Sequence, residues 1–282
     1  DTKLIFSNNE DKKLLNNITK EKIPFLTPDN INSAYCWRFY NIICIFRNEE
    51  NYKTLIHEFV HYLELDIELF SQDNSYNNIF KSNSIRMKDE IFQDLNIAEF
   101  YTETIACILN IILTIIEKDF NNNSNNSNEI NIIDDILNMM QYEITFSLFQ
   151  AAKVLNYYGF RNIEESLSFI GCSELISIDK CEQTKKVNKK IIRASTSVIA
   201  YYIIKAAVLF NINRITEFFI STDKGKLFKV FKKDLNEIRE IVIQSLSDPM
   251  FIENVNILIK LNKNYNKKNL FLFKTLRMTI FG

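Results

Sequence analysis

Apolar residues follow the period of an α-helix over most of the chain from Asn48 onward, and this pattern constrains the fold more than any other feature. The stretch before it, residues 37–47 (WRFYNIICIFR), is rich in aromatic and β-branched residues and predicts one or two β-strands. We therefore predict a helix-dominated α+β protein with a small N-terminal sheet. The expected helices cover roughly residues 51–66, 88–118, 129–158, 162–170, 184–211, 233–246, 250–262 and 266–280.

An asparagine-rich stretch, NNNSNNSN at residues 121–128, is the best candidate for a boundary within the chain. It would separate a lobe of residues 1–120 from a mainly helical lobe of residues 129–282 that completes a cleft. One continuous domain is the alternative, because 282 residues are enough for either arrangement.

Composition excludes several classes of protein. The 34 basic and 35 acidic residues nearly cancel, which argues against bulk attraction to nucleic acid. Four glycines do not form a P-loop or a dinucleotide-binding loop. The longest apolar runs are too short or carry a lysine, so we predict no membrane span. Five cysteines without a C-x-x-C pair indicate a reducing compartment, and no signal-peptide pattern opens the chain. We therefore expect a cytoplasmic protein that is not secreted.

The two histidines of the chain lie in one short motif, His57-Glu58-Phe59-Val60-His61. On a helix, positions four apart lie one turn apart on the same face, so both imidazole groups can reach one metal ion. A catalytic zinc site needs three protein ligands and leaves the fourth position for water. The histidines lie on a polar stripe of an otherwise apolar helix, which favours one zinc ion over a pair of structural histidines.

No histidine is left to act as the third ligand, so a carboxylate is expected, with a cysteine as the alternative. Glu99 and Glu103 lie on one narrow face of the next predicted helix, whose other residues are largely apolar. Buried acids need a partner, and the alternatives are a metal ion and a salt bridge to lysine or arginine. Because the two glutamates are four residues apart, the helical period does not separate them.

The sequence AEFYTET, residues 98–104, follows HEFVH and resembles the pattern of the gluzincin metallopeptidases. In that family the second acid of an E-x-x-x-E pair binds zinc, so the resemblance implies that Glu103 is the third ligand and Glu99 a supporting residue. It also implies a zincin-like core in residues 1–120. A longer likeness, which includes NSAYCW and EFYTETIACILN, is to a family of H-E-x-x-H proteins from large DNA viruses. That likeness implies a viral protein, located in the host cytoplasm or the virion.

The motif also predicts a mechanism, in which Glu58 acts as general base on a zinc-activated water. A second donor to the developing oxyanion is usual, and the candidates are Arg193, Tyr201 and Tyr202 on a later helix. Core packing is the alternative for each tyrosine, and Arg193 could instead hold a substrate carboxylate or lie on the surface. In well-studied gluzincins a tyrosine or histidine assists catalysis, and it has no identifiable match in this chain.

Two further features bear on the site. Ligating histidines usually donate their other ring N–H to a carboxylate or carbonyl, and Glu64, Asp66 and Glu99 are the nearby acids. The predicted strand at residues 42–46 precedes the motif helix, where zincins have a sheet whose edge can pair with an extended peptide.

The sequence therefore predicts a single-zinc metallopeptidase that cleaves peptide or protein amide bonds. One alternative is a binding or structural protein that retains a zincin scaffold, and another is a zinc hydrolase of non-peptide amides or esters. A peptide or protein substrate is the expected partner, and no nucleic acid is expected. The choice between endopeptidase and carboxypeptidase stays open, as does the oligomeric state.

Overall fold

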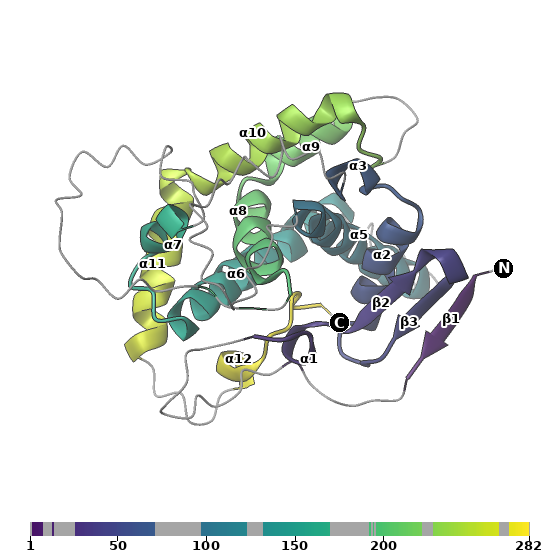
Figure 1. Ribbon diagram of the computed structural model, residues 1–282, viewed down its shortest axis with the longest axis horizontal. Helices are drawn as coiled ribbons and strands as arrows, with labels where there is room; N and C mark the ends of the chain where they lie inside the picture. The colour runs from purple at the N-terminus through teal and green to yellow at the C-terminus, as the bar shows by residue number, and fades with distance from the viewer. Residues whose placement is uncertain are drawn as a thin grey trace, which may run out of the picture.

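A three-stranded sheet lies at the N-terminal end of the computed structural model (Figure 1). The structure describes residues 2–7, 13, 26–70, 97–122, 132–169, 192, 194, 196–221, 228–264 and 271–281. The strands are β1 (Lys3–Phe6), β2 (Ala34–Trp37) and β3 (Ile42–Ile45), in the order β1-β3-β2. β1 runs parallel to β3, whereas β2 pairs antiparallel with β3 and places Cys36 opposite Ile43. The strands predicted near residues 37–47 are present, although β2 lies mostly before that range.

Helix α2 (Asn51–Tyr62) covers one face of this sheet. Alternate strand residues reach that face, because successive side chains of a strand point to opposite sides. They form a small apolar cluster of Ala34, Ile43 and Ile45, with Leu55, Phe59 and Tyr62 of α2 packed against it. The apolar side of α2, which includes Phe59 of the motif, is thus held by the sheet, and His57 and His61 face the rest of the protein.

α2 ends at Tyr62, earlier than the predicted end at residue 66. The helix stops in a Schellman turn, in which the Glu64 N–H binds the His61 carbonyl and the next N–H binds the Val60 carbonyl, both at 3.1 Å. Glu64 has a positive φ of 56°, the conformation that this turn requires. The turn directs Asp66 back to the last turn of the helix, where it meets His61.

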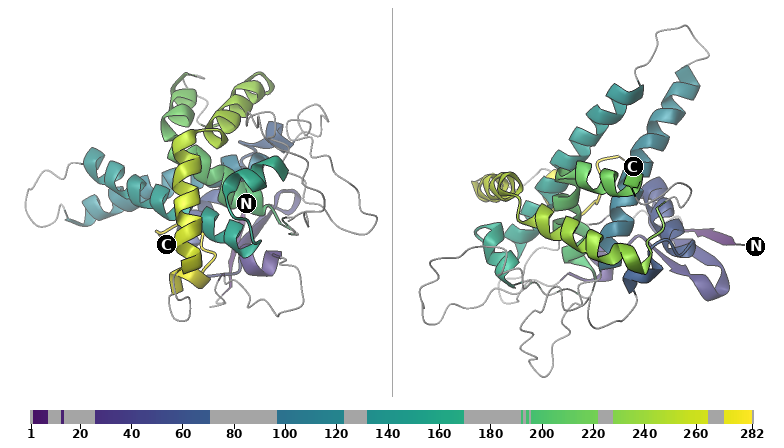
Figure 2. Two further views of the ribbon diagram at one scale, coloured as in Figure 1. Left: turned by 90° about the vertical axis from the view of Figure 1, so that its left-hand side faces the viewer. Right: turned by 90° about the horizontal axis from the view of Figure 1, so that it is seen from above.

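Two long helices, α5 (Ile97–Asn122) and α6 (Ile132–Tyr157), form the centre of the protein. α5 packs against α2 on one side and against α6 on the other. The end of α5 and the start of α6 project beyond the rest of the protein (Figure 2). The predicted boundary at residues 121–128 overlaps the end of α5, and its residues 123–128 lie outside the described part of the chain.

Within the described residues, the stretch Ala98–Phe120 of α5 is long and apolar enough to cross a membrane by length and composition alone. Of its apolar window, 61% is buried inside the protein. The core helix of a soluble protein passes the same test, and Phe100, Ile105 and Ile111 of α5 are fully buried. Packing in the core therefore accounts for the buried part of this helix, whereas Leu113, Ile116 and Phe120 in its second half are exposed.

The main apolar core contains residues from both predicted lobes. Helix α8 (Lys205–Phe210) continues a π-helical turn, η4 (Ile199–Ile204), and lies at the middle of this core (Figure 1). All residues from Ile203 to Leu209 are at most 1% exposed. π-helical turns are rare and often mark functional sites. The division into two lobes stays a prediction.

Shorter helices cover this core. They are α1 (Pro28–Ile31), α3 (Ile67–Phe70), α7 (Ile163–Phe169), α9 (Ile212–Ser221), α10 (Leu235–Leu246) and α11 (Pro249–Asn264). α7, α10 and α11 lie where the helical period predicts them, whereas α9 follows the predicted end at residue 211 and was not expected. The predicted class, helix-dominated α+β, is confirmed.

The prediction of a helix over residues 266–280 is wrong for most of the part of this range that the structure describes. α12 spans only Phe271–Lys274, and residues 275–281 continue as a non-helical segment, here called the C-terminal strap. Buried side chains bind the backbone of this strap; for example, Tyr202 donates to the Leu276 carbonyl at 2.5 Å. These tertiary hydrogen bonds replace those of a helix and outweigh the local periodicity.

Candidate metal centre

The motif residues lie where α2 packs against α5. His57 and His61 are one turn apart on α2, and Glu99 and Glu103 are one turn apart on α5. Their side chains are largely buried, with exposures of 10%, 12%, 15% and 1% in that order. The helical period thus brings two imidazole groups and two carboxylates to one interface, as the sequence predicts.

Three of these side chains converge on one point. His57 Nε2 lies 3.1 Å from His61 Nε2, and Glu99 Oε2 lies 3.4 Å and 3.5 Å from these two atoms. Ligand atoms that bind one tetrahedral zinc at 2.0–2.1 Å are about 3.3 Å apart. Within the described part of the chain, this group meets the geometric requirement for holding a metal ion. Two imidazole nitrogens and one carboxylate oxygen also form a donor set that zinc prefers.

The other ring nitrogen of each histidine faces a second carboxylate. His57 Nδ1 donates to Glu103 Oε2 at 2.9 Å, and His61 Nδ1 donates to Asp66 Oδ2 at 2.6 Å. Thr102 donates to the same Asp66 oxygen at 2.8 Å and fixes its position. A neutral histidine that donates from Nδ1 has its lone pair on Nε2, so both rings are oriented for metal binding.

Glu99 and Glu103 thus hold the opposite places from those that the gluzincin resemblance implies. Glu99 lies at the Nε2 atoms, whereas Glu103 lies on the far side of the His57 ring. Glu103 is fully buried and also binds Lys53, whose Nζ is 2.6 Å from its Oε1. The alternative considered for the buried acids, a salt bridge to lysine, is therefore present at Glu103.

The charges of this group shift its pKa values in a consistent way. Burial lowers the pKa of His57, but hydrogen bonds to Glu103 and Glu99 outweigh it and raise the pKa above its ordinary value. Burial also lowers the pKa of His61, but Asp66 and Glu99 raise it to about 10. Burial raises the pKa of Glu99, and the two histidines outweigh this effect and lower the pKa. A metal ion that binds here must therefore displace protons from the histidines.

Glu58 lies beside this group and lines a cavity of about 30 Å³ together with His57 and Tyr201. Glu58 is 6% exposed, and its carboxylate accepts no hydrogen bond from the residues that the structure describes. Burial raises its pKa, partly offset by His57 and His61. A buried carboxylate with a raised pKa suits the role of general base.

The structure separates the predicted oxyanion donors. Tyr201 lies at the site, where its hydroxyl donates to Glu99 Oε2 at 3.0 Å and its ring centroid is 6.1 Å from that of His57. Burial raises the pKa of Tyr201 well above its ordinary value, so the hydroxyl stays a donor. Tyr202 binds the C-terminal strap instead, and Arg193 lies outside the described residues.

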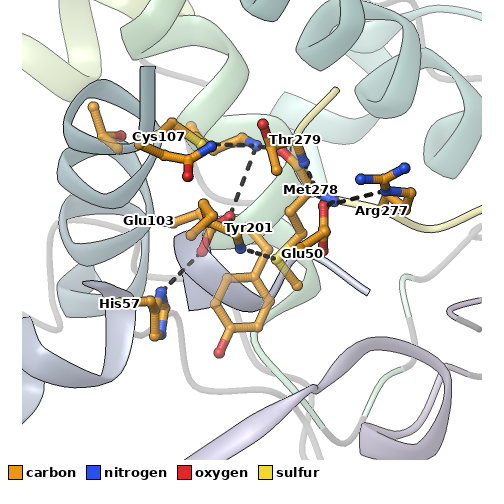
Figure 3. A network of polar contacts seen from close by, with 12 residues as sticks. Glu50, His57, Glu103, Cys107, Tyr201, Arg277, Met278 and Thr279 are labelled. Carbon is orange, nitrogen blue, oxygen red and sulfur yellow. Dashed lines mark hydrogen bonds and ion pairs between the residues drawn. The ribbon is translucent and has the colours of Figure 1, made fainter. Parts of the chain in front are cut away.

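Behind the candidate metal centre, a network of buried charges connects the motif helix to the C-terminal strap (Figure 3). Glu50, just before α2, accepts hydrogen bonds from the Met278 and Thr279 backbone N–H groups at 2.6 Å each. Lys53 lies between this contact and Glu103, with its Nζ 3.8 Å from the Met278 sulfur. Lys53 was not predicted as a site residue from the sequence. It could have been recognised as a lysine one turn before His57 on the polar face of the same helix.

No family model and no solved structure matches the chain. Two curated proteins do. The chain is 31% identical over 181 residues to uncharacterized protein R210 of Acanthamoeba polyphaga mimivirus, a match that covers 63% of this chain and 38% of that protein. It is also 31% identical over 134 residues to protein Ycf2 of Physcomitrium patens, covering 45% of this chain and 6% of Ycf2. The chain thus spans well under half the length of either relative. The first match supports a viral-like family, which agrees with the predicted likeness to proteins of large DNA viruses.

Proposed function

We propose that the protein is a zinc-dependent hydrolase of peptide bonds, with His57, His61 and Glu99 as metal ligands and Glu58 as general base. The observation that carries this proposal is the close approach of three ligand atoms, the Nε2 atoms of His57 and His61 and the Oε2 atom of Glu99. The distances between them are 3.1, 3.4 and 3.5 Å. Three protein ligands leave a fourth position for water, as in catalytic zinc sites, whereas structural sites are usually closed by four.

The proposed chemistry uses the two groups beside the triangle. A bound zinc ion would supply Lewis acidity, which lowers the pKa of water and polarises a carbonyl group. Glu58 would take the proton of the attacking water and later give it to the leaving nitrogen. Its burial and its lack of a hydrogen-bond partner among the described residues leave its carboxylate available for this transfer. Tyr201 would hold the Glu99 carboxylate in its ligating orientation through their hydrogen bond.

Peptides are the proposed substrates because an edge of the sheet borders the site. β2 is the last strand in the order β1-β3-β2, and Ala34 of β2 and its neighbour Ser33 line the cavity beside Glu58. An extended peptide could add to such an edge through main-chain hydrogen bonds, which tolerate many sequences. The resemblance to gluzincins supports the same substrate class and a zincin-like core. A location in the cytoplasm or a virion stays a prediction.

The test is the variant Glu58→Gln, compared with the wild type for zinc content and for cleavage of a peptide library. We expect one zinc per chain in both proteins and a loss of cleavage of at least about 100-fold in the variant. Glu64→Gln is the matched control, because Glu64 lies on the turn after the same helix with a side chain that is 57% exposed. It should keep both properties.

Each other outcome would change the assignment. Full cleavage by Glu58→Gln would refute the general-base role, and loss of zinc would show that Glu58 is a ligand. A zinc-loaded wild type that cleaves no peptide would favour a non-catalytic zincin scaffold, or a zinc hydrolase of non-peptide amides or esters.

A further inference from the structure

The edge strand β2 carries a row of exposed aromatic side chains. Tyr35 and Trp37 are 39% and 53% exposed, and their ring centroids lie 4.9 Å apart. Phe46 extends the row beyond Tyr35, with a centroid distance of 6.1 Å, and Tyr40 extends it beyond Trp37, at 6.2 Å. Contiguous exposed apolar surface often marks an interaction site, so this aromatic row is a candidate binding surface.

The aromatic row lies on the face of the sheet opposite to α2. Ala34 and Cys36 of β2 belong to the apolar cluster that packs against α2. Successive side chains of a strand point to opposite sides, so Tyr35 and Trp37 point away from that helix. Their rings are therefore accessible beside the outer edge of the sheet, which β2 forms (Figure 1).

The backbone of β2 has hydrogen-bonding groups directed to this outer edge. The Ser33 carbonyl accepts a hydrogen bond at 2.9 Å from the residue that follows β3, so Tyr35 and Trp37, at the same parity, also bond to β3. The backbone N–H and C=O groups of Ala34 and Cys36 then point away from β3. Among the residues that the structure describes, none bonds to these groups at the outer edge.

A peptide that pairs antiparallel with this edge would bond to the backbone of Ala34 and Cys36. Its residues opposite Tyr35 and Trp37 would form non-hydrogen-bonded pairs, in which the Cα atoms are only about 4.5 Å apart and the side chains are closest. Ala34 also lines the cavity beside Glu58. The aromatic row thus begins next to the proposed position of the scissile bond and follows the bound peptide away from it.

We propose that the aromatic row is a specificity surface that binds apolar side chains at two alternate positions of the substrate, on one side of the scissile bond. The proposal rests on the proposed peptidase function. Aromatic rings pair favourably with aromatic and β-branched side chains across neighbouring strands. The four side chains of the row carry no charge, so they favour apolar over acidic partners. A peptide substrate is the occupant because the row is continuous with the edge that borders the cavity.

The first measurement is cleavage of paired peptides that carry either valine or serine at two positions, two residues apart. Pairs that place these positions one and three, or two and four, residues from the scissile bond, on either side, cover the possible registers. In one register the zinc-loaded wild type should favour the valine peptide by about 5-fold in kcat/KM, because two cross-strand pairs are gained.

Variants of the aromatic row test whether it causes this preference. Tyr35→Thr and Trp37→Thr keep a β-branched residue in the strand, so the sheet should form, and each should reduce the preference for valine. Tyr142→Thr is the matched control, because Tyr142 is 63% exposed on α6. It should keep the preference of the wild type. A preference that survives both substitutions in β2 would overturn the proposal.

The second measurement is binding to zinc-loaded Glu58→Gln, which does not depend on turnover. Trp37 is the one tryptophan of the chain, so intrinsic fluorescence reports on the aromatic row directly. The valine peptide should shift the emission to shorter wavelength at lower concentration than the serine peptide.

The outcomes separate this proposal from the proposed function. Equal cleavage of the two peptides in every register would overturn the specificity surface and leave the peptidase function in place. A fluorescence shift that favours the valine peptide, without cleavage by the wild type, would support the surface and overturn the peptidase function. The absence of both cleavage and fluorescence shift would overturn the surface as well.

Discussion

Removal of one partner of the buried ion pair between Lys53 and Glu103 should strongly destabilise the protein. Lys53 is 2% exposed, and its ammonium group lies 2.6 Å from Glu103 Oε1. The variant Lys53→Met keeps most of the aliphatic chain. Among the residues that the structure describes, it leaves the Glu103 carboxylate with the His57 N–H and with Lys205, whose Nζ is 4.0 Å away. Removal of one partner of a buried pair costs about 3–5 kcal/mol, because the other charge stays buried. We expect this loss in the free energy of unfolding of the zinc-free protein.

The assay is urea unfolding in EDTA at pH 7, followed by circular dichroism. In a double-mutant cycle, Lys53→Met combined with Glu103→Gln should lose at least about 2 kcal/mol less than the sum of the single variants. The control is Lys118→Met, because Lys118 pairs with Asp135 at 3.4 Å with a side chain that is 60% exposed. That variant should cost under about 1 kcal/mol. A Lys53→Met variant no less stable than the control, or strictly additive effects, would refute the reasoning.

Three further predictions concern the site and its surroundings. Tyr201→Phe removes the hydroxyl that donates to Glu99 and should weaken zinc binding about 10-fold, measured by competition with a chelating dye. Tyr202→Phe should leave zinc binding unchanged, because Tyr202 binds the C-terminal strap, and equal effects of the two variants would contradict this prediction. The pKa of His61 is raised from 6.5 to about 10, so its contribution to the stability of the zinc-free protein is full below pH 6.5 and is lost as the pH rises toward 10. In urea unfolding from pH 6 to pH 10, the Asp66→Asn variant should lose less of its free energy of unfolding than the wild type. An identical pH profile in the two proteins would exclude Asp66 as the partner that raises the pKa of His61. Burial lowers the pKa of Lys153 from 10.5 to about 7, so the unfolded chain binds the additional proton and the contribution of Lys153 to stability increases as the pH rises between these values. The wild type should gain stability relative to Lys153→Met by up to about 1.4 kcal/mol per pH unit in that range, and a flat difference would contradict the shift.

The sequence predicts the helices that carry the site and the face on which each candidate residue lies. The helical period places His57 and His61 on one face of α2, and Glu99 and Glu103 on one face of α5, because residues four apart are neighbours on any helix. The period does not show which glutamate meets the histidines. That choice depends on Lys53, which binds Glu103 only once α2 and α5 pack together.

The C-terminal strap was not predictable for a similar reason. Residues 271–280 have an apolar pattern that is compatible with a helix, but only Phe271–Lys274 are helical. The strap that follows is held by side chains distant in the sequence, including Glu50, which binds two of its backbone N–H groups. Hydrogen bonds between such distant residues leave no local periodic signal.

The most direct test of the metal centre is the zinc content of matched variants, measured by native mass spectrometry with the wild type alongside. We predict one zinc per chain in the wild type and no zinc in His61→Ala or Glu99→Gln. Glu103→Gln should still hold one zinc per chain, bound more weakly than in the wild type, because Glu103 orients His57 and does not bind the metal. Zinc that is lost in Glu103→Gln and kept in Glu99→Gln would contradict the ligand set and return the third position to Glu103. A folded wild type that binds no zinc even after addition of the metal would remove the metal centre and the proposed hydrolase with it.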